Sequence, residues 1–469
     1  MPQIICRDAK FHAIIVHMSP SSADIVICGA GIAGVSAAHF LARKGFKNIL
    51  LVDERPPLDL TSSRSTECYR NWWPDPDMLA LMNHSIDLLE LLADESGNVF
   101  SLNRRGYLFV TADKTRIPVM KERAELISSL GAGSLRIHDE YTSTYTPPAP
   151  EGYRMTEAGA DLLLGASLIQ KHFPYLSDES VAAMHVRRAG WLSAQQLGMY
   201  MLDRARSQGV QFKSAKVTGV DISGGKVKSV ELDSEEKIHT DTFINAAGPY
   251  FKQVGNLCGL DIPVFTELHL KVAFKDHLSA VGREAPLLIW DDPQLLEWEQ
   301  DERALLAGDP ETRWLTEPFP SGAHTRPEGG SGSQMVLMLW EYQTQLMDPI
   351  PSPPLDEYYP EVALRGMARM IPALKNYFGR FPRPHLDGGF YTKTRENRPL
   401  VGPTPIKGVF LLGAISGYGI MSACGVGDLL SSHIAGIPLP AYAQSFVLNR
   451  YNDPSYLKWL ETWNESGQL

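Results

Sequence analysis

A glycine-rich turn between two apolar runs near the N-terminus constrains the fold more than any other feature of this chain. Residues 24–28 (DIVIC) form a short β-branched run, residues 29–34 (GAGIAG) follow directly, and small and apolar residues continue to residue 45. A second apolar run, residues 48–53 (NILLVD), ends in a carboxylate. This order predicts a strand, a tight turn, a helix and a second strand, which is the βαβ unit of a dinucleotide-binding domain.

The glycines of the turn have separate physical tasks. Gly29 lets the chain turn sharply, Gly31 leaves room for a pyrophosphate near the backbone, and Gly34 allows the helix to press against the strand. Unpaired N–H groups at the start of the helix then face the phosphates. Asp53 is placed to accept hydrogen bonds from the adenosine ribose, and its charge disfavours the 2′-phosphate of NADP.

Two later segments decide which dinucleotide is expected. Residues 241–250 (DTFINAAGPY) predict a buried strand that runs into a glycine turn, and residues 408–421 (GVFLLGAISGYGIM) predict another strand followed by a helix that continues through residue 428. The second glycine-rich junction lies far from the first, which indicates that the chain returns to the same sheet to complete one site. A nicotinamide enzyme rarely needs this return, so FAD is expected rather than NAD.

Length and composition bound the other possibilities. With 469 residues the chain exceeds one hydrophobic core, so two or more domains are expected. A net charge of −10 disfavours nucleic acids and anionic membrane surfaces as partners. Five cysteines without a CxxC spacing argue against a disulfide framework and a thiolate metal site, so we expect no metal and a reducing, cytoplasmic location. The apolar run 11–18 is too short to span a bilayer and precedes no cleavage site; Met18 is an alternative start.

Four segments together resemble the superfamily of FAD-dependent oxidoreductases that contains D-amino-acid oxidase, glycine oxidase and sarcosine oxidase. They are the GAGIAG turn, residues 244–250 (INAAGPY), residues 389–402 (GFYTKTRENRPLVG) and residues 414–427 (AISGYGIMSACGVG). The resemblance runs from residue 24 to about residue 436 and is poor between about 285 and 385. Within the superfamily, the segments resemble those of monomeric sarcosine oxidase, dimethylglycine dehydrogenase and the flavin subunits of proline dehydrogenases.

The resemblance implies a mixed α/β fold with two domains. One is an FAD-binding, Rossmann-like domain built from discontinuous segments, and the other is a substrate domain with a mainly antiparallel sheet. The expected bounds are 1–23 for a flexible tail, 24–80, 150–262 and 386–447 for the FAD-binding domain, 81–149 and 263–385 for the substrate domain, and 448–469 for a C-terminal tail or helix. Patterning adds a helix over 190–206 with Ser193 as its cap, and a hairpin around the turn 223–225. Residues 291–334 are either a lid or an insertion without function.

The motifs and the resemblance together give a set of expected FAD contacts. They are Gly29, Gly31, Ile32, Ala33, Gly34, Asp53, Glu54, Ser62, Ser63, Arg64, Val217, Ala247, Gly248, Gly413, Gly417, Tyr418, Gly419, Ile420 and Met421. Relatives that attach FAD covalently use a cysteine or histidine at positions held here by Gly389–Phe390 and by residues 63–65. We therefore expect non-covalent FAD.

Arg70 is the first candidate for the substrate. The resemblance implies that an arginine at the end of the segment TECYR pairs with a substrate carboxylate, for which a planar guanidinium suits. The alternative is an ion pair with a neighbouring acid. Arg395 is a second candidate for substrate or flavin, with a structural pair to Glu396 as its alternative.

Other candidates rest on weaker patterns. Tyr418 and Met421 stand where relatives often carry a histidine and a lysine, which makes sarcosine itself less expected as the substrate. Trp72 and Trp73 either wall a pocket or belong to the core, and His269 faces either the pocket or a neighbouring strand.

The expected reaction is oxidation of a C–N bond in a secondary amine or amino-acid-like substrate. Hydride moves from carbon to flavin N5, which leaves an imine, and Tyr418 is a hypothetical influence on amine protonation. Oxygen or an electron carrier reoxidises the flavin, and the residues do not distinguish the two. The alternatives are a flavin monooxygenase-type enzyme and a flavoprotein whose FAD is structural. The sequence carries no signal for the oligomeric state.

Overall fold

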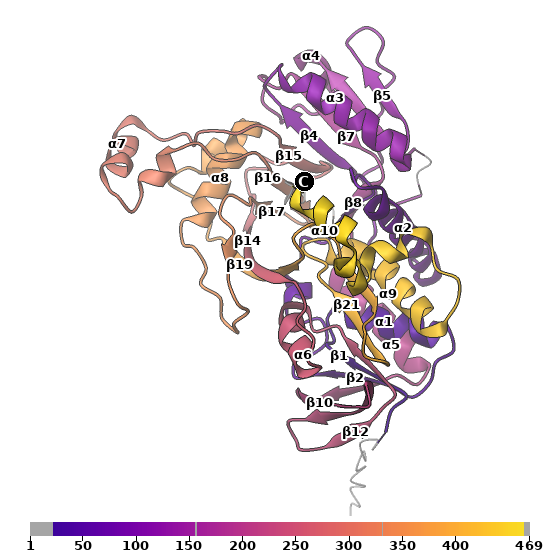
Figure 1. Ribbon diagram of the computed structural model, residues 1–469. Helices are drawn as coiled ribbons and strands as arrows, with labels where there is room; N and C mark the ends of the chain where they lie inside the picture. The colour runs from indigo at the N-terminus through magenta and orange to yellow at the C-terminus, as the bar shows by residue number, and fades with distance from the viewer. Residues whose placement is uncertain (1–21, 155–156, 331, 464–469) are drawn as a thin grey trace, which may run out of the picture.

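The computed structural model describes residues 22–154, 157–330 and 332–463. This part of the chain forms a six-stranded sheet, a ten-stranded sheet, a three-stranded sheet and a two-stranded ribbon. The six-stranded sheet and its helices form one end of the molecule, and the ten-stranded sheet forms the other (Figure 1). The expectation of a mixed α/β fold with a mainly antiparallel second sheet is confirmed.

The six-stranded sheet gathers strands from four distant parts of the chain. Its order is β20-β21-β13-β1-β2-β9, in which β20 is antiparallel to β21 and the other pairs are parallel. The strands are β1 (Ile25–Cys28), β2 (Ile49–Asp53), β9 (Gln211–Ser214), β13 (Thr242–Asn245), β20 (Leu400–Pro403) and β21 (Val409–Gly413). Parallel strands align their carboxyl ends, so the glycine turns that follow β1, β13 and β21 meet at one edge.

Both faces of this sheet are covered, as a parallel sheet requires. One face packs against the helices α1 (Ile32–Arg43), α2 (Pro76–Ser96), α5 (Ala194–Ser207) and α9 (Gly419–Ala435), which share a core with β1 and β2. The other face packs against β10 (Val217–Ser223), β11 (Lys226–Leu232) and β12 (Lys237–His239). The short helix α6 (Phe251–Leu257) follows β13.

The ten-stranded sheet has the order β18-β14-β17-β16-β15-β4-β7-β6-β5, with β19 paired to β14. Its described pairs are antiparallel except β15 with β4 and β5 with β6. The strands are β4 (Tyr107–Thr111), β5 (Leu135–His138), β6 (Ala160–Leu164), β7 (Ala182–Val186), β14 (Phe265–Lys275), β15 (Leu287–Trp290), β16 (Ala323–Glu328), β17 (Met335–Leu339), β18 (Gln345–Leu346) and β19 (His385–Lys393). The ribbon pairs β3 (Cys68–Arg70) with β8 (Ala189–Trp191).

The two faces of the ten-stranded sheet have different neighbours. Alternate side chains such as Leu108 and Trp290 share a core with α4 (Ala166–His172) and α8 (Tyr359–Met370). The intervening side chains, such as Phe109 and Ile289, share a core with the helices of the six-stranded sheet. The second face is therefore the one that packs toward the helices of the six-stranded sheet.

Local predictions hold in the structure. Helix α5 begins after Ser193, whose Oγ accepts a hydrogen bond from the Gln196 N–H at 3.4 Å. The predicted hairpin is β10 and β11, joined through Gly224 and Gly225, which both adopt positive φ. The segment 1–21, with the proposed start at Met18, lies outside the described residues.

Some segments lie elsewhere than the sequence suggested. Residues 160–186, expected with the FAD-binding segments, supply β6 and β7 of the larger sheet, and α2, expected mostly with the substrate domain, packs on α9. These placements depend on strand partners distant in sequence, and the division into domains stays a prediction.

Within 291–334, α7 (Gln300–Gly308) protrudes with no buried residue, whereas β16 is an inner strand (Figure 1). The remaining helices are α3 (Arg116–Ile127) and α10 (Pro454–Glu461).

Candidate functional site

A cavity of about 750 Å³ lies where the glycine turns meet. Its lining includes the turn after β1, the end of β2, the turn after β13, part of β19, and the junction between β21 and α9. The predicted FAD contacts that line it are Gly29, Gly31, Ile32, Ala33, Asp53, Glu54, Ser62, Val217, Ala247, Gly248, Gly413, Gly417, Gly419 and Ile420. The residues predicted to contact the two ends of one dinucleotide thus border a single cavity. Its volume is typical of a small-molecule site.

The turn after β1 admits only glycine at two positions. Gly29 has φ +106°, and a Cβ there would lie 2.3 Å from the carbonyl oxygen of Ala246. A Cβ on Gly34 would lie 1.8 Å from the carbonyl oxygen of Gly29. At Gly31, by contrast, a Cβ would meet only Ser62 Oγ, at 3.4 Å, and would project toward the cavity that Gly31 lines. The turn is therefore a cradle open on the side of Gly31.

Two polar side chains fix the backbone around this cradle. Asp53 accepts hydrogen bonds from the N–H groups of Ala30 (2.8 Å) and Arg55 (2.9 Å), one at each carboxylate oxygen. Ser62 Oγ accepts a hydrogen bond from the Ile32 N–H at 3.0 Å, in the first turn of α1. The first turn of α1 thus presents N–H donors to an acceptor beside the cavity, as a phosphate site requires.

The opposite part of the lining contains strained backbone. Ala414 and Ser416 have φ values of 53° and 45°, which non-glycine residues rarely adopt. Ser416 N–H donates to the Thr392 carbonyl (3.0 Å), which fastens this turn to β19. Helix α9 begins directly afterwards at Gly419, so its first N–H groups lie at the cavity. Strain concentrated in a ligand-facing turn is typical of a functional site.

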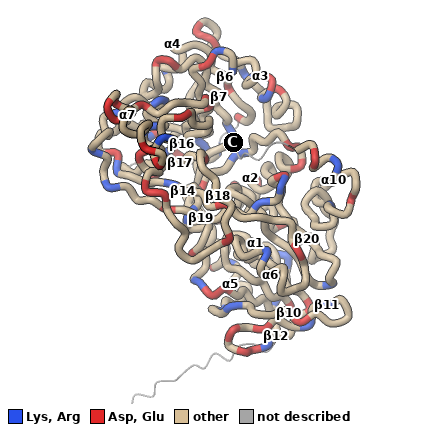
Figure 2. Tube along the Cα trace, turned by 60° about the vertical axis from the view of Figure 1, so that its left-hand side comes forward, with Lys and Arg blue, Asp and Glu red and all other residues tan. Residues whose placement is uncertain are grey.

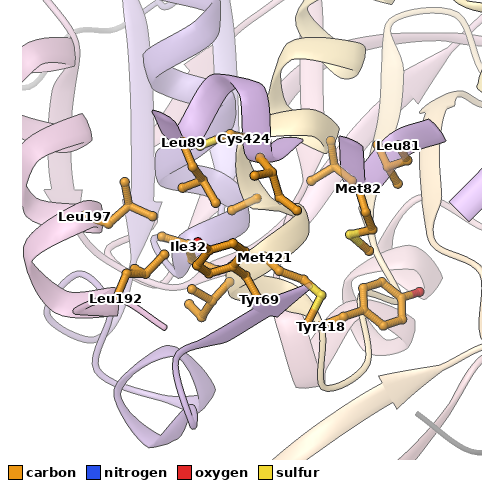
Figure 3. Close-up of a cluster of buried hydrophobic side chains, with 14 of the residues drawn as sticks. Ile32, Tyr69, Leu81, Met82, Leu89, Leu192, Leu197, Tyr418, Met421 and Cys424 are labelled. Carbon is orange, nitrogen blue, oxygen red and sulfur yellow. The ribbon is translucent and has the colours of Figure 1, made fainter. Parts of the chain in front are cut away.

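Five predicted FAD contacts do not line the cavity. Gly34 lies inside α1, Ser63 Oγ donates to the Asp59 and Leu60 carbonyls, and Arg64 donates to the Gly388 carbonyl. Tyr418 and Met421 point into the buried cluster between α1, α2 and α9, beside Met82 and Tyr69 (Figure 3). Their predicted roles stay predictions.

The hydroxyl of Tyr418 already has partners. It donates to the carbonyl of Asn397 at 2.8 Å, and the Ala414 carbonyl lies 3.2 Å away. Burial holds the pKa of this phenol well above its ordinary value. The ring packs edge-on against Trp73, with centroids 5.4 Å apart.

Arg70 lines a second, smaller cavity of about 300 Å³ together with Trp72 and Trp73. Its side chain is 6% exposed, and its guanidinium lies 4.9 Å from the Trp73 ring centroid and 5.7 Å from that of Tyr107. Burial lowers the pKa of this guanidinium. Arg395 is exposed and lines neither cavity.

A group of charged residues lies behind the first cavity, in which His269 and Lys393 are buried and Glu341 is exposed. Only the histidine was a candidate on the sequence. His269 Nε2 is 3.1 Å from Glu267 and its Nδ1 is 3.2 Å from Glu341, while Lys393 Nζ donates to Glu267 at 2.7 Å. The His269 ring stacks on Tyr391, which lines the cavity. His269 thus lies next to a lining residue and within a charge cluster.

Other lining residues were missed. Tyr391, Thr392 and Tyr250 line the first cavity, as do Ala414 and Ser416. The motif GFYTKT was available as a signal for the first two. The backbone conformations of Ala414 and Ser416 have no signature in residue type, because both residues ordinarily avoid positive φ.

The βαβ cradle, the carboxylate at the end of β2 and the returning strand β21 define a dinucleotide-binding protein of the α/β class. The model of the DAO family, described as FAD dependent oxidoreductase, matches residues 24–433. The chain belongs to this family, and it is an FAD-dependent oxidoreductase.

Curated relatives share sequence with this chain, and solved structures share its fold. Human mitochondrial dimethylglycine dehydrogenase is 24% identical over 453 residues, which cover 94% of this chain and 45% of that protein. The chain thus spans less than half of that relative. L-proline dehydrogenase from P. horikoshii superposes with a TM-score of 0.70 at 20% identity, covering 92% of this chain and 99% of the other. Glycine oxidase from Bacillus cereus gives a TM-score of 0.66 at 15% identity, with coverages of 88% and 95%.

The first cavity fits FAD. The cradle around Gly31 leaves room that a larger residue would fill, and N–H donors at the starts of α1 and α9 border the same space.

Among the described helices, none combines the length and apolarity needed to cross a bilayer. Acidic and basic residues are interspersed over both ends of the molecule (Figure 2).

Proposed function

We propose that the protein oxidises a C–N bond in a secondary amine or an amino-acid-like substrate and releases an imine. FAD, when bound, supplies the hydride acceptor at N5. The residues of the chain supply the rest of what the reaction requires. They bind the amine, orient the carbon next to nitrogen and exclude water. The relatives named above supply the substrate class, since their names refer to dimethylglycine, proline and glycine.

The observation that carries the proposal is the position of Arg70. Its guanidinium is almost fully buried, lines a cavity between the two sheets, and is held between the rings of Trp73 and Tyr107. A buried cation at a cavity wall favours an anionic group in the ligand, because the low local dielectric strengthens the pairing. A substrate carboxylate is the group proposed here, as the resemblance to sarcosine-oxidase-like proteins implies.

Exclusion of water follows from the surroundings of this arginine. Phe109 and Met184 of the larger sheet and Met78 of α2 line the same cavity. These apolar side chains reduce the access of water to an amine bound beside Arg70, and an amine in such surroundings binds best when its charge is matched or removed.

The test is anaerobic reduction of the flavin. Purified protein is mixed with amino acids, N-methyl amino acids and cyclic amines without oxygen, and flavin absorbance is followed. We expect bleaching by at least one carboxylate-bearing amine without a nicotinamide. Bleaching by NADPH alone would instead indicate the monooxygenase-type alternative, and no bleaching by any donor class would indicate a structural flavin.

The acceptor and the compartment are further parts of the proposal. Oxygen or an electron carrier reoxidises the reduced flavin in this proposal. The rate of flavin reoxidation in air, compared with the rate with an artificial dye acceptor, distinguishes the two. The four described cysteines are buried and free, in agreement with a reducing compartment such as the cytoplasm. The human relative is mitochondrial by name, so subcellular fractionation decides between these locations.

A further inference from the structure

The second cavity combines apolar walls with polar atoms that lack partners. Phe109 and Met184 from the larger sheet line it, together with Trp72, Glu396 and Asn397 from the segments around the six-stranded sheet. No residue of its lining also lines the first cavity, within the described ranges. Its volume of about 300 Å³ is at the lower end for small-molecule sites, so it suits a small ligand.

Four buried polar atoms of this lining have no hydrogen-bond partner in the described part of the chain. They are the indole Nε1 atoms of Trp72 and Trp463, Oε2 of Glu396 and Oδ1 of Asn397. Trp72, Glu396 and Asn397 are 5%, 2% and 8% exposed, and Trp463 is half-buried. An unsatisfied buried group costs about 1–3 kcal/mol, and native proteins contain few of them. Four unpartnered atoms around one small cavity indicate that a ligand supplies the missing partners.

Glu396 is held so that only one of its oxygens is available. Its Oε1 accepts hydrogen bonds from Arg450 Nη2 (2.6 Å), the Tyr451 hydroxyl (2.8 Å) and the Tyr456 hydroxyl (2.9 Å). These bonds fix the carboxylate and leave Oε2 as a positioned acceptor. Asn397, the next residue, adds an acceptor from a left-handed backbone position with φ 58°.

The other acids of the lining are already paired. Asp75 is 2.7 Å from Arg398, and Asp291 is 2.8 Å from Arg116. Glu396 is therefore the acid of this lining with an unpartnered buried oxygen, as far as the described residues show.

The donors and acceptors of the lining thus match a molecule that carries one positive and one negative group. We propose that the second cavity binds a small amino acid as a zwitterion, with its ammonium group on Glu396 Oε2 and Asn397 Oδ1 and its carboxylate facing Arg70 and the indole N–H of Trp72. Phe109 and Met184 contact its apolar part.

This inference rests on the proposed function in one respect, since the bound amino acid is taken to be the substrate. It assigns the ammonium-binding side to Glu396 and Asn397. Neither residue was a candidate for substrate binding on the sequence, where Glu396 was only a structural partner for Arg395.

The test compares amino acids with isosteres that lack the charged nitrogen. N,N-Dimethylglycine is paired with 3-methylbutanoate, and proline with cyclopentanecarboxylate. Binding to the flavin-loaded protein is measured by calorimetry and by perturbation of the flavin spectrum, and anaerobic bleaching is recorded in parallel. We expect at least one amino acid to bind about tenfold or more tightly than its isostere.

Two variants test the ammonium-binding side. In Asn397→Asp a second carboxylate faces the cavity, and aspartate tolerates the left-handed backbone; we expect about fivefold or greater tightening for the amino acid and weaker binding of the isostere. In Glu396→Gln the amide keeps one oxygen for Arg450 and turns a donor toward the ligand; we expect at least tenfold weaker amino-acid binding and unchanged isostere binding. Asn98→Asp is the matched control, because Asn98 also has positive φ (59°) and lies outside both cavities.

The outcomes are distinct. Equal changes for amino acid and isostere, or no change in Asn397→Asp with full flavin content, would overturn the inference, as would the absence of any binding. Amino-acid binding that depends on Asn397 without flavin bleaching would support the binding site and overturn the proposed function. Flavin bleaching that is unaffected in both variants would support the proposed function and would contradict the proposed binding site.

Discussion

The imidazole of His269 lies flat on the phenol ring of Tyr391, with ring centroids 3.9 Å apart and an interplanar angle of 17°. Tyr391 lines the first cavity, and His269 hydrogen-bonds to two carboxylates behind it. The wall of the cavity is therefore supported by a charged group that belongs to the larger sheet. Charge on His269 and Glu341 then affects the stability of this wall.

The bond between His269 and Glu341 makes stability depend on pH. Burial alone would lower the pKa of His269, but hydrogen bonds to Glu267 and Glu341 raise it overall. Burial alone would raise the pKa of Glu341, but the bond from His269 lowers it to about 2. The Glu341 contribution is present above its unfolded pKa of about 4.3 and is lost as pH falls toward 2. The His269 contribution is present below about pH 6.5 and is lost as pH rises through its raised pKa.

Glu341→Gln should therefore destabilise the protein most between about pH 4.5 and 6.5. A hydrogen bond between charged groups contributes about 1–3 kcal/mol, but the Glu341 side chain is 33% exposed and its charge is partly screened by water. We therefore expect a loss at the lower limit, about 1 kcal/mol, at pH 5.5 and a smaller loss at pH 9. Thermal unfolding across this range measures it. Glu297→Gln, which removes an exposed pair with Lys375, is the control and should change little at any pH. An equal loss at both pH values for Glu341→Gln would contradict the account.

Alanine at Gly29 and at Gly31 should have different effects. At Gly29 the Cβ would lie 2.3 Å from a carbonyl oxygen at positive φ, so we expect little folded protein. At Gly31 the nearest atom is 3.4 Å away, so the fold should persist while the methyl group occupies space beside the cofactor. Flavin content of the purified protein should fall at least tenfold for Gly31→Ala, with far-UV circular dichroism unchanged. A Gly31→Ala protein with full flavin content would show that this face of the turn does not border the pyrophosphate.

Part of this site could be predicted from the sequence because its cause is local. The GAGIAG turn, the strand before it and Asp53 are contiguous, and the spacing alone requires a βαβ unit. The pairing of His269 with Glu341 could not be predicted, because it depends on β14 and β17 being neighbours in the larger sheet. Arg395 shows the opposite case: it stands in a recognisable motif, yet its side chain is exposed and away from both cavities.

The flavin should be released by acid. Cys28 is the cysteine that lines the first cavity within the described ranges, so its thiol is the candidate for covalent attachment. Burial raises the pKa of this thiol, so it stays protonated and poorly nucleophilic. After precipitation with trichloroacetic acid we expect all flavin absorbance in the supernatant. Yellow colour that remains in the washed pellet would identify a covalent bond.

Arg70 should act on carboxylate-bearing substrates alone. Arg70→Ala removes a buried cation from the second cavity, so we expect the rate of flavin reduction at low substrate to fall about 100-fold for an amino acid. Arg70→Lys should recover only part of this rate, because an ammonium lacks the planar fork. For an amine without a carboxylate, the rate of flavin reduction should be the same in Arg70→Ala as in the unmodified protein. Equal losses for both kinds of amine would mean that Arg70 supports the fold rather than the carboxylate.

Arg395→Ala tests the second arginine in the same assay. The exposed position of Arg395, outside both cavities, leads us to expect less than a twofold change in the reduction rate. A loss comparable with that of Arg70→Ala would place Arg395 at the substrate after all.

Tyr418→Phe separates a chemical role of the phenol from a structural one. The hydroxyl donates to the Asn397 carbonyl at 2.8 Å, and burial raises its pKa far above the assay range, so it stays protonated throughout. We expect an unchanged pH profile of flavin reduction between pH 6 and 10, and a loss of about 1 kcal/mol in the free energy of unfolding. Tyr69→Phe is the matched control, because Tyr69 is equally buried and donates to the Asn103 carbonyl at 2.7 Å. A shifted pH profile in Tyr418→Phe alone would instead show that its hydroxyl influences the protonation of the amine.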